Sequence, residues 1–225
     1  MTLSLHTLGE ISLNISTGIY FIWFLPQLIL TFKSRVISHL SLGMHTILVI
    51  GYSADLMYGF GQHLPIQYKL VSMVGLILLI IEHYQFWAYK KWQEKDKIVF
   101  NALTLFFIFL FFYAIYTLIL RTHSPQFYNW IGASSWICWL FFMFPQIWKN
   151  FLHQSVEGVS IPSVSLAILS NVGDIISAFC LAFAWPNKIG SCIILLPKFI
   201  LLMQCLCHTK SHTKKIGSLS PMASP

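Results

Sequence analysis

The stretch GIYFIWFLPQLILTFKSR at residues 18–35 decides the fold, because it returns as ICWLFFMFPQIWKNFLHQ at residues 137–154. In each copy a Pro-Gln pair stands inside an apolar run. A single shift of 119 residues, without gaps over about 45 positions, aligns these identical pairs: Ser16 with Ser135, Pro26 with Pro145, Gln27 with Gln146, Phe32 with Phe151, Ser41 with Ser160, Asp55 with Asp174 and Phe60 with Phe179. We therefore expect one structural unit that occurs twice in the chain.

The composition indicates a membrane protein. Hydrophobic residues make up 56% of the chain and charged residues 9%, whereas a soluble domain averages roughly 25% charged residues. Seven runs approach or exceed the ~20 apolar residues of a helical span, and they are too long and too uniformly apolar for barrel strands. The predicted spans cover residues 11–32, 40–60, 66–89, 98–120, 128–148, 159–183 and 189–207. The expected fold class is all-α transmembrane, with seven helices.

The net charge of +7 follows a membrane pattern and gives no reason to expect nucleic acid as a partner. Most basic residues follow the odd-numbered predicted spans: Lys33, Arg35, Lys90, Lys91, Lys95, Lys97, Lys149, Lys210, Lys214 and Lys215. The opposite ends of the spans carry only Lys69, Arg121 and Lys188. Because basic loops stay in the cytosol, the N-terminus is expected outside or in a lumen, and the C-terminus in the cytosol.

The spans divide into three, one and three. Residues 1–97 form the first three-helix repeat, residues 98–127 a linker helix without a counterpart, and residues 128–207 the second repeat. Residues 208–225 read as a disordered basic cytosolic tail. An odd number of spans between the Pro-Gln segments gives both repeats the same orientation, so they are parallel about an axis along the membrane normal. Such repeats place a substrate site between the two halves.

The two Pro-Gln segments resemble the motifs of the PQ-loop family, which includes cystinosin, lysosomal cationic amino-acid exporters and, more distantly, SWEET sugar transporters and KDEL receptors. The second motif matches the family pattern at Pro145, Gln146, Asn150, Ser155, Gly158 and Ser160. The first departs from it, with Val36 for the usual Ser and His39 for the usual Gly. The stretches QHLPIQ at residues 62–67 and NWIGASSW at residues 129–136 resemble the cationic amino-acid exporter branch.

The prolines predict two matched kinks. Proline in a helix removes one backbone hydrogen bond and frees a carbonyl, which neighbouring groups in a membrane must satisfy. Gln27 and Gln146, each next to its proline, are placed to do so. A single Pro26 or Pro145 would read as a bend only. Two in register near the cytosolic face predict hinges of an inner gate, a role that the family resemblance also implies.

Two acids occupy matched positions inside spans. A charged residue at mid-membrane costs at least ~2.5 kcal/mol, so Asp55 and Asp174 are candidates for function. Each lies about 15 residues, or ~22 Å, from the cytosolic start of its helix. They are expected to face each other across a central cavity and to bind protons. Hydrogen bonds to a nearby Ser or Asn that only join helices are the alternative. The resemblance implies a polar residue beside them, which Asn171 supplies, with Tyr52 at the equivalent place.

Lys198 follows a proline near the middle of the last span, where a charge needs a partner. The candidates are Asp174, Asp55, Glu82 or the carboxylate of a substrate. A retinal-binding lysine would also suit seven helices, but the parallel repeat and the Pro-Gln pairs disfavour it.

Glu82 and His83 lie in the third span, toward the cytosol. Either is a candidate second proton-binding residue, because histidine titrates near neutral pH. The favoured interpretation is a pair between Glu82 and Lys90 or Lys91, with His83 packed at the membrane boundary.

These features predict a secondary transporter that moves a small polar solute by alternating access. The resemblance implies an amino acid, either a cationic amino acid or cystine, and the paired acids suggest proton coupling. A zwitterion needs an anionic and a cationic partner, and the spans contain both. A KDEL-receptor-like sorting receptor and a SWEET-like sugar transporter are the alternatives.

The remaining expectations concern chemistry and location. The sequence contains no convincing Ser-His-Asp order, metal-ligand spacing or phosphate-binding glycine loop, so no enzyme activity, metal or cofactor is expected. The expected partners are a small solute, protons and the lipid bilayer, with the oligomeric state open. The resemblance implies a lysosomal or vacuolar membrane in a eukaryote, and the inner membrane in a bacterium.

Overall fold

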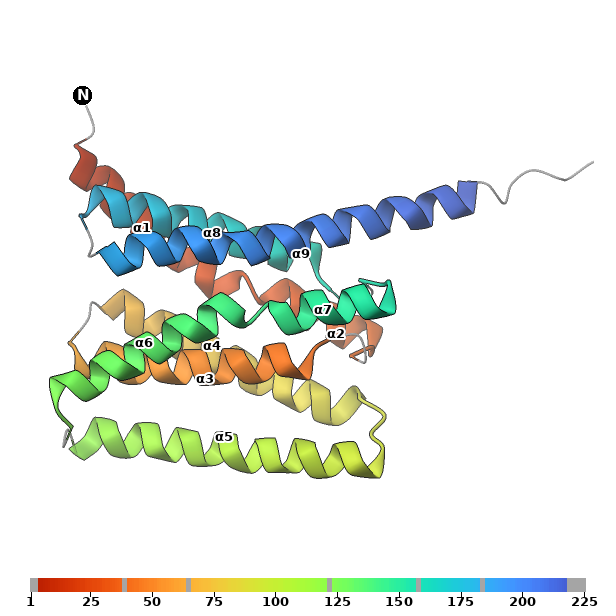
Figure 1. Cartoon of the computed structure of the whole chain (residues 1–225), viewed down its shortest axis with the longest axis horizontal. Helices are drawn as coiled ribbons and strands as arrows, with labels where there is room; N and C mark the ends of the chain where they lie inside the picture. The colour runs from red at the N-terminus through yellow and green to blue at the C-terminus, as the bar shows by residue number, and fades with distance from the viewer. Residues whose placement is uncertain are drawn as a thin grey trace, which may run out of the picture.

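The computed structural model describes residues 4–37, 40–63, 66–120, 123–156, 159–182 and 185–217, which leaves His39 and Gly158 of the two motifs outside. Within these residues all regular structure is helical, in nine helices (Figure 1). Their bounds are α1 Leu5–Ile22, α2 Leu25–Ser34, α3 Leu42–Gly61, α4 Ile66–Tyr89, α5 Glu94–Leu120, α6 Pro125–Phe141, α7 Phe144–His153, α8 Ile161–Cys180 and α9 Trp185–Gly217. Because α1 continues into α2 and α6 into α7, the nine helices form seven rods.

The seven rods correspond to the seven predicted spans. Five are long and apolar enough to cross a membrane by themselves: Leu5–Ser34, Ile66–Tyr89, Glu94–Thr117, Pro125–His153 and Ile161–Cys180. The other two are α3 and α9, whose apolar part runs over Ser191–Cys207. More than half of α3 is buried, including His45 and Asp55, so its polar groups face protein and lower its hydropathy. The predicted all-α, seven-helix membrane fold is confirmed.

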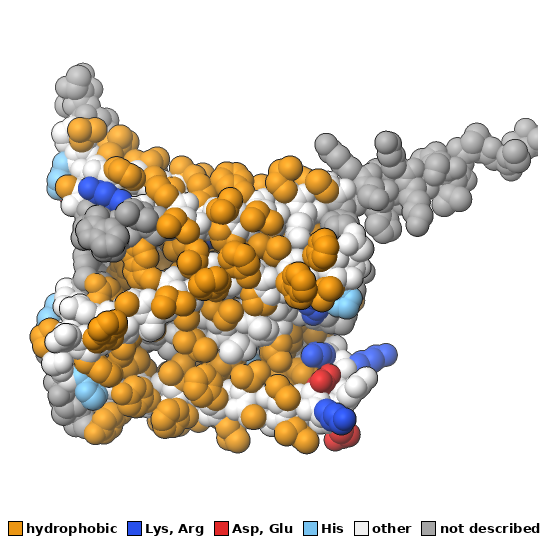
Figure 2. Space-filling model, viewed as in Figure 1, with side chains coloured by type: hydrophobic (Ala, Val, Ile, Leu, Met, Phe, Trp, Pro, Cys, Tyr) orange, Lys and Arg blue, Asp and Glu red, His pale blue; other side chains and the backbone are white. Residues whose placement is uncertain are grey.

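The surface suits a bilayer. Large apolar side chains are exposed along the rods, and Figure 2 shows them across most of one face of the molecule. Lys and Arg side chains gather mainly at the end where α4 turns into α5. At this same end α2 and α7 terminate (Figure 1). We call it the basic end; by the positive-inside rule it is the predicted cytosolic end.

Both broken rods are interrupted at their Pro-Gln pairs. Pro26 and Pro145 stand in the first turn of α2 and α7, where the missing backbone N–H does no harm to the new helix. Both helices also end alike, because Arg35 and Gln154 adopt left-handed backbone conformations with φ of 55° and 49°. The predicted kinks are thus full breaks, and the two repeats share their local geometry.

The two repeats are held together by their first and middle rods. α1 of the first repeat packs along α8 of the second, and α6 of the second packs along α3 of the first. Figure 1 shows α5 at the edge of the bundle, where it packs on α3. The interface between the repeats is therefore built from matched helices. The residue boundaries proposed for the repeats and the linker stay predictions.

α9 extends into the residues for which a disordered tail is predicted, and the disorder itself stays a prediction. α9 continues as a helix past residue 207 to Gly217, and residues 218–225 lie outside the described part of the chain. Extending a helix already anchored in the bundle adds one hydrogen bond for each residue fixed, so a polar segment can continue it.

Candidate functional site

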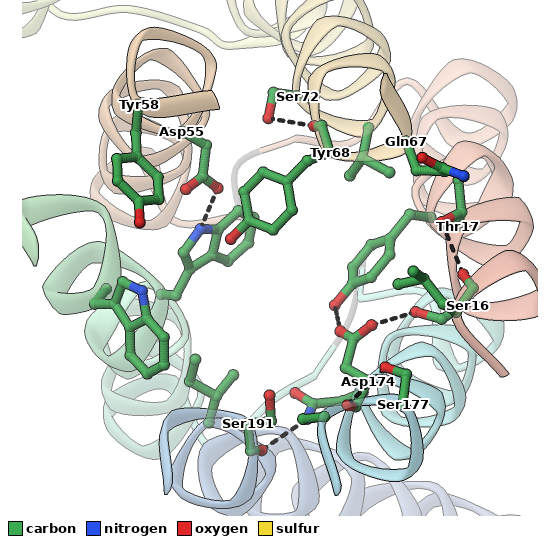
Figure 3. A pocket seen from close by; sticks show the side chains of 18 of the residues that line it. Ser16, Thr17, Asp55, Tyr58, Gln67, Tyr68, Ser72, Asp174, Ser177 and Ser191 are labelled. Carbon is green, nitrogen blue, oxygen red and sulfur yellow. Dashed lines mark hydrogen bonds between the residues drawn. The ribbon is translucent and has the colours of Figure 1, made fainter. Parts of the chain in front are cut away.

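A cavity of about 330 Å³ lies between the two repeats (Figure 3). It is lined by α1, α3 and α4 of the first repeat and by α6, α8 and α9 of the second; none of its lining residues comes from α5. Sites for small organic ligands occupy ~300–1,000 Å³. The cavity thus has room for a small solute, at the place where the parallel repeat predicts a site.

Asp174 reaches this cavity from α8. Its carboxylate accepts hydrogen bonds from the Ser16 hydroxyl and, at 2.6 Å, from the Tyr20 hydroxyl, both on α1 (Figure 3). The close approach of α1 and α8 makes this possible: the Ser12 hydroxyl donates to the Gly173 carbonyl at 2.9 Å, and a Cβ on Gly173 would press on Ser16. Side chains on α1, the first helix of the first repeat, thus bind the acid on α8, the middle helix of the second repeat.

Asp55 on α3 is held in the same way. It accepts hydrogen bonds from the Ser135 hydroxyl and, at 2.6 Å, from the Trp139 indole nitrogen, both on α6. Ser135 and Trp139 stand 119 residues after Ser16 and Tyr20, so the two clamps are related by the repeat. Figure 3 places Asp55 and Asp174 on opposite sides of the cavity. Both acids line the cavity, and both also join the repeats.

The partners in these clamps were not predicted. The sequence suggested a nearby Ser or Asn in general as the alternative role of the two acids, without naming the residue. The aligned pair of Ser16 and Ser135 was a usable signal, since a small hydroxyl at matched positions inside two spans suggests a matched role. Which acid each serine contacts is decided by the packing of the helices, which brings Ser16 to Asp174 and Ser135 to Asp55.

Lys198 lines the cavity from α9 and is 3% exposed. Its ammonium donates to Asn171 Oδ1 at 2.7 Å and to the Ala167 carbonyl at 3.0 Å, both on α8. The Asn171 amide donates in turn to the Ser191 carbonyl at 2.7 Å. An ammonium has three donors, so one remains for a ligand.

Among the candidate partners of Lys198, Asp174 lies close enough to act on it electrostatically, and the carboxylate of a substrate stays a prediction. Among the described residues no ion pair joins Lys198 to Asp55, Asp174 or Glu82. Because α8 and α9 pack closely, the nearest acceptors are the Asn171 side chain and a backbone carbonyl. Asn171 thereby positions the lysine beside the cavity.

Gln27 and Gln146 cross from one repeat to the other. Gln27 Oε1 accepts a hydrogen bond from the Ser160 backbone N–H at 2.7 Å, and Gln146 Oε1 accepts from the Ser41 backbone N–H at 2.6 Å. Ser160 and Ser41 are the N-cap residues of α8 and α3. The glutamines were expected to serve the carbonyls freed by proline; these contacts show each of them capping the middle helix of the other repeat.

An apolar cluster lies between the cavity and the basic end. Its centre comes from the two helix breaks, Trp23 and Phe24 in one and Phe142 and Met143 in the other, all at most 5% exposed. Around them pack Leu28, Met44, Leu48, Val164 and Leu201. The cavity-lining part of α1 ends at Tyr20, directly before this cluster. The cluster and the glutamine caps thus lie together on the basic side of the cavity.

Glu82 lies outside this cavity. It is 1% exposed and contacts His45 Nδ1 on α3 at 2.6 Å. The favoured interpretation, a pair with Lys90 or Lys91, is therefore wrong, because Glu82 faces the bundle interior and Lys90 lies over the Trp92 ring. In the described part of the chain no group of three or more His, Cys, Asp or Glu is arranged to hold a metal.

Comparison with known proteins agrees with this architecture. Residues 8–68 and 127–187 each match the family described as "PQ loop repeat". A 99-residue stretch is 33% identical to the vacuolar histidine transporter YPQ3 of Saccharomyces cerevisiae, covering 42% of this chain and 32% of that protein. The match thus spans about a third of the length of that relative.

A solved structure of a eukaryotic SWEET transporter resembles the fold with a TM-score of 0.62, over 90% of this chain and 99% of that chain. At 13% identity the likeness concerns the fold alone. The two family matches lie on the two repeats and together cover more than half of the sequence. The chain therefore belongs to the PQ-loop repeat family, as a multi-pass membrane protein that contains two such repeats.

Proposed function

We propose that this protein is a proton-coupled secondary transporter of amino acids with a cationic side chain, working by alternating access. The observation that carries the proposal is the cavity between the repeats, in which two carboxylates and one ammonium line a single space. Ionisable groups inside membrane spans mark substrate and ion pathways. Parallel repeats with a cavity between them are an architecture of secondary transporters.

The charges in the cavity complement a cationic amino acid. Lys198 has a donor left for the substrate carboxylate, while Asp174 and Asp55 lie on opposite sides of the space. The α-ammonium or the cationic side chain of the substrate can pair with one of these acids, which leaves the other for a proton. A sugar carries no charge to pair with these groups, and cystine has a second carboxylate that Lys198 cannot also pair with. A histidine transporter among the relatives supports the same class.

The helix breaks supply a mechanism for alternating access. On the basic side the cavity is closed by side chains from both breaks and by the two glutamine caps. Because these caps join the repeats across their interface, opening the basic end requires Gln27 and Gln146 to release Ser160 and Ser41. Pro26 and Pro145 let the ends of the two rods move while α1 and α6 stay in place.

Proton coupling is assigned to the two clamped acids. Asp55 and Asp174 accept hydrogen bonds from neutral donors, hydroxyls and an indole. A proton can therefore neutralise either carboxylate without breaking an ion pair in the protein. When the substrate pairs with one carboxylate, the other can carry a proton, so solute and proton cross in the same direction, which the inward gradient tests.

The membrane is inferred from the family. We infer a vacuolar or lysosomal membrane for a eukaryotic host, in line with the vacuolar relative, and the inner membrane for a bacterial host. In either case the basic end faces the cytosol.

The test uses the full chain in proteoliposomes, with and without an inward proton gradient. Radiolabelled lysine, arginine, histidine, cystine, a neutral amino-acid mixture and glucose are offered in turn. We expect saturable, gradient-stimulated uptake of at least one cationic amino acid, which the double variant D55N/D174N loses.

Two results would overturn the proposal. The first is gradient-driven uptake retained in the double variant, because the acids would then not couple protons. The second is glucose uptake, or binding of a KDEL-type peptide without any flux, which would favour a sugar transporter or a sorting receptor. The purified double variant must elute as the wild type does on size exclusion, so that loss of uptake reflects chemistry.

A further inference from the structure

A second set of titratable groups is buried between α3, α4 and α5. His45 Nδ1 lies 2.6 Å from Glu82 Oε2, and His45 Nε2 lies 3.2 Å from His83 Nδ1. His83 Nε2 lies 2.9 Å from Thr104 Oγ1. The four side chains form one hydrogen-bonded row that runs from the fully buried Glu82 to the half-buried His83 and Thr104. We call this row the histidine row.

The histidine row is separate from the solute cavity. None of its members lines that cavity. His45 precedes Asp55 by ten residues on α3, which corresponds to ~15 Å along the helix axis, toward the basic end. The two sites are therefore distinct, yet one helix carries a residue of each.

The repeat itself does not need these polar groups. The shift of 119 places Val164, Leu201 and Leu202 at the positions of His45, Glu82 and His83. Val164 and Leu201 are buried in the second repeat, at 4% and 2% exposure. The same helix packing thus forms with apolar side chains. Burying a charged or polar group is unfavourable, so stabilising the fold does not explain why these polar side chains are present in the row.

One oxygen of Glu82 also argues against a purely structural pair. Glu82 Oε1 is buried and, among the described residues, has no hydrogen-bond partner. Buried polar atoms in membranes and protein interiors are nearly always paired. A carboxylate that only joined α3 to α4 would be expected to use both oxygens.

The hydrogen bonds locate a proton in the row. The Thr104 hydroxyl donates its only hydrogen to the Phe100 carbonyl at 2.9 Å, so His83 Nε2 must donate to Thr104. His83 Nδ1 is then an acceptor, and His45 Nε2 must donate to it. The contact between His45 Nδ1 and Glu82 Oε2 therefore needs one further proton, shared by an acid and a base.

The same row can also exist without that proton. If both imidazoles exchange tautomers and the Thr104 hydroxyl turns from Phe100 to His83, every contact keeps one hydrogen. In that arrangement His45 Nδ1–H donates to an ionised Glu82, and the row carries one proton fewer. Protonation at the half-buried end followed by transfer along the row restores the first state, so the row can bind and release a proton through His83.

Among the described residues the salt bridges include none between the row and a further charged group. α6 carries no charged residue, and Glu10 on α1 pairs with His6. Asp55 and Lys69 stand toward the other ends of α3 and α4, where Asp55 contacts Trp139 and Lys69 lies over the Phe60 ring. The other charges on the neighbouring elements lie at the basic end: Lys33, Arg35, Lys90, Lys91, Glu94, Lys95, Asp96, Lys97 and Lys149. Of these, Arg35 contacts Tyr89, Lys90 lies over Trp92, Lys97 pairs with Glu94 and Lys149 donates to the Leu40 carbonyl. The charge of the row therefore depends on its own proton.

We propose that Glu82, His45 and His83 form a proton-binding site in the half of the first repeat next to the basic end, apart from the solute cavity. This site takes up one proton and makes transport sensitive to pH on that side; this coupling role rests on the function proposed above. An unperturbed histidine side chain changes its charge between pH 5 and 8, so this is the range in which the site is tested.

The test counts protons on the full chain in lipid nanodiscs, titrated between pH 5 and 8. The key variant, H45V/E82L/H83L, gives the first repeat the residues of the second. E82Q is a milder variant of nearly unchanged size, and L202I at the equivalent place in the second repeat is the control. Wild type and L202I are expected to bind the same number of protons, and the triple variant and E82Q at least one fewer.

Flux measurements on the same samples then test the coupling role. A pH step on the basic side is expected to change the uptake of wild type at least fivefold and that of E82Q less than twofold. Unchanged proton numbers in both variants would overturn the site. Fewer bound protons with an unchanged response to the pH step would overturn the coupling role alone. If wild type moves none of the offered solutes, the function proposed above fails while the proton count still decides the site.

Discussion

The two repeats share the main contacts of their first and middle rods and differ in several buried polar residues of their middle and third rods. The breaks at Pro26 and Pro145, the acid clamps on Asp55 and Asp174, and the glutamine caps all obey the same 119-residue shift. On the third rods, α4 and α9, the shift relates unlike residues. Leu79 corresponds to Lys198, and Glu82 to Leu201.

This difference separates the residues that build the interface between the repeats from the residues that give one repeat its chemistry. The matched contacts all cross between the repeats, so they build and close the interface symmetrically. The unmatched residues occur in one repeat only, so they supply its particular chemistry. Tyr52 shows this in the first repeat: it occupies the place of Asn171 and packs its ring against Trp139, with centroids 4.8 Å apart. The first repeat thus has an aromatic ring where the second has the amide that accepts a hydrogen bond from Lys198.

The largest effect is expected from removal of the Lys198 ammonium. The variant K198L gives the second repeat the residue of the first, and the substrate carboxylate loses its partner. Uptake of the preferred cationic amino acid is expected to fall at least 100-fold, or ~2.7 kcal/mol, measured as initial rates in proteoliposomes. The matched variant L79M in the first repeat is expected to stay within twofold. Equal losses in both would mean that the third rods matter only for packing.

A smaller effect, but an equal one in the two repeats, is expected from the acid clamps. D55N and D174N each keep an oxygen that accepts the hydroxyl bond, yet neither can bind a proton or a substrate cation. Each is expected to lower gradient-driven uptake at least tenfold. A loss confined to one of them would show that the matched clamps have unequal roles.

The packing of Gly75 on α4, the third rod of the first repeat, can be tested by measuring the stability of a variant. A Cβ on Gly75 would overlap the Tyr52 ring, whereas Ile194 stands at the equivalent place in the second repeat. G75A is expected to destabilise the protein by about 1–3 kcal/mol, the usual cost of overpacking. Thermal unfolding in nanodiscs measures it. Gly18 has nothing near its Cβ position, so G18A is the control and is expected to be neutral or slightly stabilising.

The smallest effect is expected at the glutamine caps. Q27A and Q146A each leave the N-cap N–H of the opposite repeat without its acceptor, which costs about 1 kcal/mol. Because the caps hold the basic end closed, each variant is expected to raise the rate of opening two- to threefold. Single-molecule distance measurements across the basic end can follow this opening. An effect in only one variant would contradict the symmetric gate.

The sequence by itself determined the class of fold. Long apolar runs and the shift of 119 depend only on the order of residues, so the seven rods, the two repeats and the breaks at the prolines could be predicted. The positions of Asp55, Asp174 and Lys198 inside spans were likewise visible, because a charge in an apolar run stands out by itself.

Only the tertiary structure decided the partners. Ser16 and Tyr20 stand more than 150 residues from Asp174, Gln146 stands 105 residues from Ser41, and His45 stands 37 from Glu82. No local pattern links such distant residues, because the contacts arise where α1 meets α8, α6 meets α3 and α3 meets α4. The sequence shows which side chains are too polar to face lipid. The packing of the helices then determines which neighbour each of these side chains contacts.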